Sequence, residues 1–146
     1  MGANDFATEW YSYDEHDGDY AMEHFSVAHD DSTLVPYIRH AQRYQPDMQL
    51  FASPWSPPTW MKFPKAYNFG RMVMTPENLT AYADYFVRYI RAYRDRGIRI
   101  TQLHVQNEVF ADQKFPSCLW SSADLKVFIR DYLGPRFDEG GSGRGD

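Results

Sequence analysis

The run Thr101-Gln102-Leu103-His104-Val105-Gln106-Asn107-Glu108 ends on an amide and a carboxylate, directly before an irregular segment that contains a proline. Its apolar content predicts a strand, and barrel enzymes keep catalytic acids at strand ends. A glutamic acid with a raised pKa can protonate a leaving-group oxygen while a neighbouring amide holds a substrate hydroxyl. Asn107 and Glu108 could therefore act on a glycosidic bond, although an Asn-Glu pair taken alone is more often part of a solvated loop.

A second segment, residues 50–62, carries aromatic side chains on a stiff backbone. A short apolar strand that begins at Leu50 runs into three prolines and two tryptophans. Proline removes backbone donors and fixes φ, so the strand must end near Ser53. Rigid indole rings on a loop offer apolar faces that stack on sugar rings at little cost in entropy. We assign Trp55 to ligand contact, and Trp60 with Met61 to core packing.

Three segments of the chain resemble glycoside hydrolase family 30 and occur in that family's order. They are 52–62 (Ala-Ser-Pro-Trp-Ser-Pro-Pro-Thr-Trp-Met-Lys), 106–108 (Gln-Asn-Glu) and 115–120 (Phe-Pro-Ser-Cys-Leu-Trp). The resemblance extends from Gly2 through Phe137. Further family-like positions are Tyr11-Ser12-Tyr13-Asp14, Phe25-Ser26-Val27 and Leu133-Gly134-Pro135. The family includes glucosylceramidases and β-1,6-glucanases.

The resemblance implies a retaining β-glycosidase built on a (β/α)8 barrel. In that family Glu108 corresponds to the general acid/base and Asn107 to the amide that holds a hydroxyl. Asp5 resembles the sugar-binding aspartate, and Trp55 resembles the sugar-contacting tryptophan. The implied partner is a carbohydrate or glycolipid substrate, either glucosylceramide-like or a β-glucan, and no metal or organic cofactor is implied. One departure is Val109, which stands where many members carry proline.

The length of the chain predicts only part of such a barrel. A (β/α)8 barrel takes about 250 residues, whereas this chain has 146. We expect roughly the first half, in parallel βα units over residues 1–137, and a disordered Gly-rich tail over 138–146. Met1 falls within what should be an early strand and no late strand follows, so the family's nucleophilic carboxylate is expected to be missing. The isolated fragment should then be inactive, and its open sheet edges should allow self-association.

Composition narrows the class of partner. The net charge of −5 provides no basic patch for nucleic acid, while the 43 % hydrophobic and 17 % aromatic content suits a packed core with flat surfaces for ring stacking. Cys118 is the single cysteine, which excludes an internal disulfide and favours a packed thiol. No apolar run predicts an integral membrane segment. The N-terminus lacks the features of a signal peptide, and both secreted and cytoplasmic locations stay open.

Helical and strand-like segments alternate along the chain. Apolar spacing predicts a helix over about 31–44, with Asp31 or Ser32 as its cap, before the strand at 50–53. A longer helix is predicted from Thr75 to just before Gly97, with an apolar stripe of Leu79, Tyr82, Phe86, Ile90 and Tyr93. A strand at 98–106 and a helix from Ser121 or Ser122 to Gly134-Pro135 follow. This order predicts parallel βα units.

Strict alternation along the strand at 98–106 would send Asn107 and Glu108 to opposite faces. For both side chains to reach one sugar, the backbone must twist or bulge at its last residues, so we expect irregular backbone there. His104 would lie inside the barrel, where a hydrogen-bonded filler is favoured over a catalyst. The acidic segment from Tyr11 to Tyr20 lacks the spacing of a calcium loop, and a solvated loop is favoured.

Two other functions stay open on the sequence. One is a sugar-binding or structural remnant in which Asp5, Trp55 and Asn107 retain affinity without turnover. The other is a different barrel glycosidase, such as a cellulase or xylanase relative, which the Ser-Pro-Trp-Ser-Pro-Pro segment disfavours.

Overall fold

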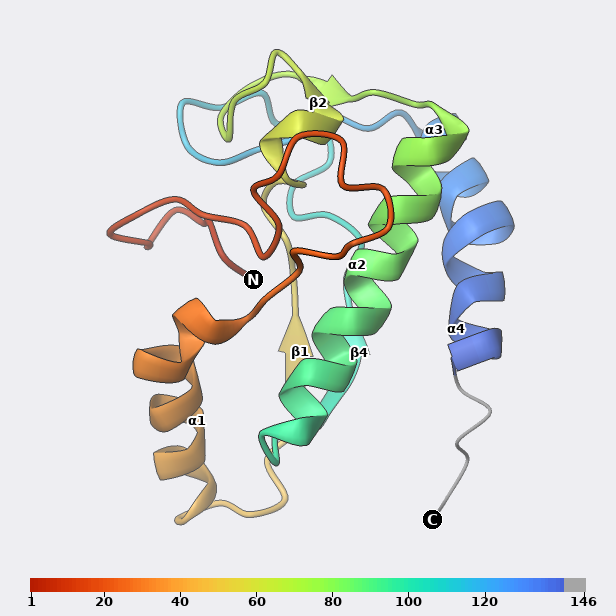
Figure 1. Ribbon diagram of the computed structural model, residues 1–146. Helices are drawn as coiled ribbons and strands as arrows, with labels where there is room; N and C mark the ends of the chain where they lie inside the picture. The colour runs from red at the N-terminus through yellow and green to blue at the C-terminus, as the bar shows by residue number, and fades with distance from the viewer. Residues whose placement is uncertain (141–146) are drawn as a thin grey trace.

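Two parallel strands, β1 (Leu50–Ala52) and β4 (Ile100–Leu103), lie hydrogen-bonded side by side at the centre of the computed structural model, which describes residues 1–140 (Figure 1). Between them the chain forms a long loop and then α2 (Pro76–Asp95), which contacts β4. A strand, a helix packed on the sheet and a parallel neighbouring strand form the repeating unit of a (β/α)8 barrel. The other elements in chain order are η1 (Ala28–Ser32), α1 (Leu34–Gln42), η2 (Thr59–Met61), β2 (Lys62–Phe63), β3 (Arg71–Met72), α3 (Ser122–Val127), η3 (Phe128–Leu133) and α4 (Gly134–Gly140).

Helix α2 begins and ends as its sequence predicts. The Thr75 hydroxyl accepts a hydrogen bond from the Asn78 N–H at 3.3 Å, and Pro76 occupies the first turn, where its missing N–H costs nothing. Gly97, with φ of +72°, follows the helix and turns the chain toward β4. The predicted apolar stripe faces the core: Leu79, Tyr82, Phe86 and Tyr93 are buried and Ile90 is half-buried.

Helix α1 begins later than predicted, and neither expected cap is used. Its N-cap residue, Thr33, makes no side-chain capping bond, while Asp31 and Ser32 belong to the preceding 3-10 turn. Both side chains have other partners, because Asp31 forms an ion pair with Arg96 and the Ser32 hydroxyl donates to the carbonyl of His29. Contacts from outside the helix therefore override the local capping signal.

The last helix does not stop at Gly134-Pro135 as predicted. The Ser121 hydroxyl caps α3 by accepting from the Asp124 N–H at 3.0 Å, and the chain then continues through the π-helical turn η3 into α4. Proline lacks an N–H and its ring clashes with the carbonyl four residues earlier in a regular α-helix. The wider π turn directly before Pro135 accommodates it.

The predicted tail from residue 138 is thus also corrected in part. Residues 138–140 belong to α4, so the helix continues three positions past the expected boundary. The remainder of that prediction, residues 141–146, lies outside the described residues.

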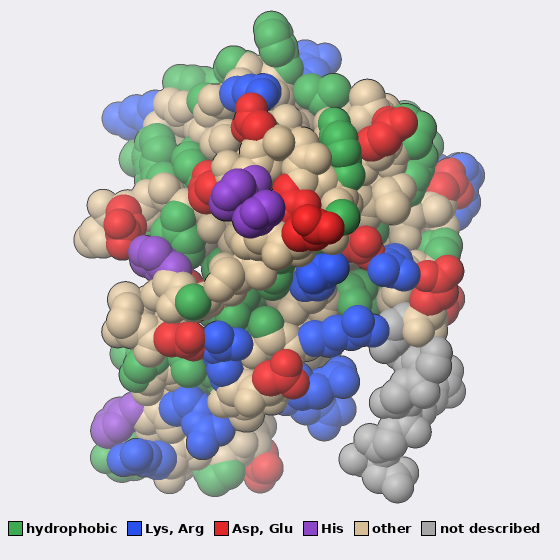
Figure 2. Space-filling model, in the orientation of Figure 1, with side chains coloured by type: hydrophobic (Ala, Val, Ile, Leu, Met, Phe, Trp, Pro, Cys, Tyr) green, Lys and Arg blue, Asp and Glu red, His purple; other side chains and the backbone are tan. Residues whose placement is uncertain are grey.

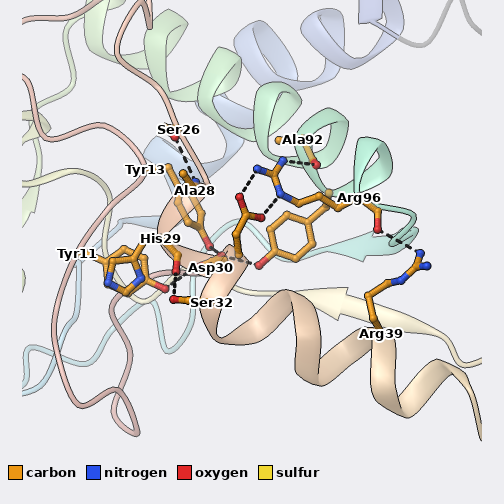
Figure 3. Close-up of polar contacts among 12 residues, drawn as sticks. Tyr11, Tyr13, Ser26, Ala28, His29, Asp30, Ser32, Arg39, Ala92 and Arg96 are labelled. Atoms are coloured by element: carbon orange, nitrogen blue, oxygen red, sulfur yellow. Dashed lines mark hydrogen bonds and ion pairs between the residues drawn. The ribbon is translucent and has the colours of Figure 1, made fainter.

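The core is built mainly from aromatic rings, including Tyr82 and Phe86 of α2, Phe128 of η3 and Trp120, which precedes α3. A buried carboxyl group, Asp30, lies at one side of it and accepts hydrogen bonds from tyrosine hydroxyls (Figure 3). Tyr13 donates at 2.7 Å and Tyr93 at 2.5 Å, and Tyr11 donates as well. Burial raises the pKa of Tyr13 and of Tyr93, so both hydroxyls keep the protons that they donate.

The acidic segment from Tyr11 to Tyr20 is not the fully solvated loop that the sequence favours. Tyr13 and Asp14 are buried within it, and the Asp14 carbonyl accepts from the Trp60 indole N–H at 3.1 Å. Burial raises the pKa of Asp14 to about 6, and the nearby charge of Asp19 adds to the shift. Among residues 1–140, no group of three or more His, Cys, Asp or Glu side chains is arranged to hold a metal ion.

Within the same residues, no helix combines the length and the apolar character that crossing a membrane requires.

Candidate active site

The ends of β1 and β4 hold Trp55, Asn107 and Glu108 next to one another. Pairing continues past both strands, since the His104 N–H donates to Ala52 O at 2.9 Å and the Asn107 N–H donates to Pro54 O at 2.8 Å. The Gln106 side-chain amide donates to Trp55 O at 2.7 Å. Two segments about 50 residues apart in sequence therefore meet at the C-terminal ends of parallel strands, the edge at which α/β barrels place their active sites.

Glu108 lies on irregular backbone, as predicted from the alternation of its strand. Its φ is +44°, a left-handed value that is uncommon for a residue with a side chain. Its carbonyl accepts from the Ala111 N–H at 2.9 Å, which closes a tight turn. The side chain is exposed, and its carboxylate accepts a hydrogen bond from the side-chain amide of Gln113. The turn removes Glu108 from strict strand alternation.

Trp55 is half-buried beside this turn. Its indole N–H is enclosed and has no acceptor among residues 1–140, and the Gln106 side-chain oxygen is likewise enclosed without a donor. Together with Met1 and Ser53, Trp55 helps to line a cavity of about 260 Å³. Trp60, by contrast, is buried in the core, and this confirms its assignment to packing.

Asp5 lies in an exposed turn and makes no hydrogen bond or ion pair within the described chain. The N-terminal segment that carries it reaches the end of β1, because the Met1 ammonium group donates to Ser53 O at 3.4 Å. The structure thus brings together Trp55, Asn107 and Glu108. It places Asp5 on a neighbouring segment without a direct contact to them.

His104 has the structural role that the sequence favours. Its Nδ1 and the Ser53 hydroxyl are 2.6 Å apart, and the Gln102 side-chain nitrogen lies 3.1 Å from Nε2. Since the Gln102 amide nitrogen can only donate there, Nε2 is the acceptor of that contact. Both ring nitrogens are then used: Nδ1 connects to Ser53 at the end of β1, and Nε2 accepts from Gln102 of the preceding strand β4.

The sequence interpretation missed Lys62 and Gln113. Lys62 is buried and its Nζ donates to three backbone carbonyls in the loops that follow β1 and β4. Lysine is rarely buried, and a lysine between Met61 and Phe63 carries no local signal that it would be. Cys118, beside these loops, is fully buried, and burial raises the pKa of its thiol to about 12, in agreement with a packed rather than reactive thiol.

Comparisons with known proteins agree with the geometry. The family described as "Glycosyl hydrolase family 30 TIM-barrel domain" matches residues 1–145. The chain is 34 % identical over 142 residues to "Putative glucosylceramidase 3" of Caenorhabditis elegans, covering 92 % of this chain and 27 % of that protein. It is 28 % identical to an endo-1,6-β-D-glucanase of Neurospora crassa, covering 90 % of this chain and 28 % of that protein.

Among solved structures, SrfJ from Salmonella typhimurium matches with a TM-score of 0.88 at 35 % identity, covering 96 % of this chain and 31 % of that one. The chain therefore spans less than a third of the length of each of these relatives. Its βαβ unit is part of the barrel that they share, which confirms the predicted partial (β/α)8 fold. Because the family match covers nearly its whole length, the chain belongs to glycosyl hydrolase family 30.

Proposed function

We propose that this chain supplies the general acid/base, Glu108, of a retaining hydrolase that acts on β-linked glucosides. The observation that carries the proposal is the pairing beyond β1 and β4, which holds Trp55, Asn107 and Glu108 at one sheet edge. Glu108 protonates the glycosidic oxygen as that bond breaks, while a second carboxylate forms a bond to the anomeric carbon. Glu108 then takes a proton from the water that releases the sugar from this intermediate.

The second carboxylate comes from the part of the enzyme that this chain does not span. A retaining site places its two carboxyl groups about 5 Å apart, and the relatives are more than three times as long as the matched segment. The chain by itself is therefore expected to bind sugar weakly and to show no turnover. Weak binding without turnover is also what the alternative function, a sugar-binding remnant, predicts for the isolated chain.

The proposed substrate is a neutral β-glucoside, either a glycolipid like glucosylceramide or a β-glucan. Relatives named for both activities support this range, and the acidic net charge of the chain suits an uncharged sugar. Asn107 would hold the hydroxyl next to the reacting carbon. Trp55 would contact the ring, and Asp5 would accept hydroxyl hydrogen bonds at the edge of the site.

The test compares the isolated chain with a chimera in which the chain replaces the matching third of SrfJ. The isolated chain should not hydrolyse aryl β-glucosides, and the chimera should. In the chimera, Glu108→Gln should lower kcat by about 10²- to 10⁴-fold with poor leaving groups, because general acid catalysis is lost. It should spare the first step with activated aryl glucosides, which need little protonation to leave.

The matched control is Glu23→Gln, which changes an exposed glutamate in a loop and should leave the rates unchanged. Hydrolysis by the isolated chain that Glu108→Gln does not affect would contradict both the role of Glu108 and the need for a second carboxylate. A folded chimera without β-glucosidase activity would count against the substrate class.

A further inference from the structure

The loop that follows β1 and the loop that carries Glu108 are joined through one buried charge. Lys62 is 2 % exposed, and its Nζ donates to Ala66 O at 2.7 Å and Tyr67 O at 3.0 Å in its own loop. Its third donor reaches across to Ser117 O at 2.6 Å in the loop after β4. An ammonium group has three N–H donors, so all three are used.

Ser117 extends this connection toward the turn of Glu108. Its hydroxyl accepts from the Phe69 N–H at 3.0 Å and from the Gln113 N–H at 3.2 Å, and it lies 3.4 Å from Gln113 O. Its own N–H donates to Tyr67 O at 3.0 Å. The backbone of Gln113 is therefore held on both its donor and its acceptor side by one buried hydroxyl.

Gln113 completes the path, because its side-chain amide donates to the Glu108 carboxylate. Glu108 is exposed, so packing does not fix its rotamer, and this hydrogen bond sets where the carboxylate points. A continuous series of contacts thus runs from Lys62 through Ser117 and Gln113 to Glu108. The first link, from Lys62 to Ser117, joins residues 55 positions apart, and the other two lie within the loop after β4.

Joining two loops through a buried lysine carries a free-energy cost that a purely structural contact between neutral groups would avoid. Burying an ammonium group without a paired carboxylate carries a desolvation penalty, and burial lowers the pKa of Lys62 to about 8, partly opposed by the charge of Asp112. That pKa still lies above neutrality, so the group keeps three donors. The three hydrogen bonds of Lys62 offset this desolvation penalty, and they fix the geometry of both loops at the end of the molecule where the site lies.

We propose that Lys62, acting through Ser117 and Gln113, is a positioning residue that aims the Glu108 carboxylate at the glycosidic oxygen. Its catalytic consequence rests on the proposed role of Glu108. The structural part of the proposal, the coupling of Lys62 to the Glu108 side chain, does not depend on catalysis. The structural coupling and the catalytic effect can therefore be tested separately.

The structural test uses NMR on the full chain labelled with ¹⁵N and ¹³C. In the wild type, the side-chain amide resonances of Gln113 should follow the titration of the Glu108 carboxyl group. In Lys62→Met, which keeps the length of the side chain and removes its donors, that coupling should be lost. Lys65→Met is the matched control, since Lys65 is an exposed lysine three residues later whose partner is Asp17.

The catalytic test uses the SrfJ chimera with two aryl β-glucosides, one with an activated and one with a poor leaving group. Lys62→Met should lower kcat about 10- to 100-fold for the poor leaving group, as expected for a misplaced catalytic group. It should change the rate with the activated substrate little. A purely structural role would reduce both rates together, and that result would overturn the proposal.

If Lys62→Met does not fold, Ser117→Ala tests the same path, because it removes the shared hydroxyl and leaves the lysine in place. The same selective loss supports the proposal, and unchanged Gln113 coupling in a folded Ser117→Ala chain overturns it. An inactive wild-type chimera would count against the proposed function alone, since the NMR coupling would still decide the role of Lys62.

Discussion

Two adjacent aspartates, Asp30 and Asp31, show how different the surroundings of one residue type are in this chain. Asp30 is fully buried and accepts from the hydroxyls of Tyr11 and Tyr13 (Figure 3) and of Tyr93. Asp31, by contrast, lies at the surface and pairs with Arg96. A buried acceptor that serves several donors is more important for stability than an exposed ion pair, because its removal leaves those donors without partners.

We predict that Asp30→Ala lowers the free energy of unfolding by about 3 kcal/mol, since the buried tyrosine hydroxyls lose their common acceptor. Asp31→Ala is the matched control, and its effect should be far smaller. Urea denaturation at neutral pH, followed by tryptophan fluorescence, measures both. Equal losses in the two variants would show that the hydroxyls find other partners.

Asp14 should make stability depend on pH in the opposite direction to a salt-bridged carboxylate. Its pKa rises from 3.8 in the unfolded chain to about 6 in the folded one, chiefly through burial. The folded state then binds the extra proton between about pH 4 and 6, so this stabilisation is present at low pH and is lost as pH rises through 6. The expected loss by pH 7 is about 2 kcal/mol.

Asp14→Asn isolates this effect, because the amide that replaces the carboxyl group cannot ionise, while the neighbouring side chains His16, His24 and Asp19 are the same in both proteins. The free energy of unfolding of the variant relative to the wild type should increase by about that amount between pH 4 and pH 7. Denaturant titrations at a series of pH values measure the difference. A difference that stays constant over this range would show that Asp14 is charged throughout.

At the scale of elements, the starts of α2 and α3 follow their own sequences, while the start of α1 follows its surroundings. Thr75 and Ser121 each accept from an N–H in the first turn of the helix they begin. No residue of α1 is buried, and its cap residue makes no side-chain bond. Local signals therefore fix helix ends where nothing else competes for the capping side chain.

Thr75→Ala should destabilise the chain by about 1 kcal/mol, the usual cost of removing a capping hydroxyl. Thr80→Ala is the control, because Thr80 lies exposed within α2 and alanine is the better helix former there. Its effect should be neutral or slightly stabilising. Thermal unfolding followed by circular dichroism compares the two, and equal effects would show that the cap bond contributes nothing.

At the scale of the whole molecule, much apolar surface is open. β1 and β4 pair with each other and with no further strand among residues 1–140. Phe51 in β1 is 65 % exposed and Phe63 in β2 is 74 % exposed. Hydrophobic side chains reach the surface around the end of the molecule that carries β2 (Figures 1 and 2). Open strand edges and exposed aromatic rings promote association.

We predict that the isolated chain self-associates. Sedimentation velocity should show a coefficient that rises with concentration, and Phe51→Lys should reduce the increase by placing a charge on the open sheet. Tyr37→Lys, which alters a similarly exposed ring on α1, should have less effect. A monomer with one sharp, concentration-independent unfolding transition would contradict this prediction.

The sequence by itself determined the parts of this protein that depend on local chemistry. Prolines end β1, Thr75 and Ser121 begin helices, and strand alternation predicted the irregular backbone at Glu108. The order of its motifs pointed to the family that the comparisons then showed. In each case the cause lies within a few residues of its effect.

Only the tertiary structure decided which polar groups are buried and what they contact. Asp30 and Tyr93 are 63 positions apart and Lys62 and Ser117 are 55 apart, so no local pattern distinguishes Asp30 from Asp31 or Lys62 from Lys65. The start of α1 was likewise set by the partners that Asp31 and Ser32 contact outside the helix. A local sequence pattern describes each residue and its neighbours along the chain, but a buried charge is stabilised by partners that only folding brings near.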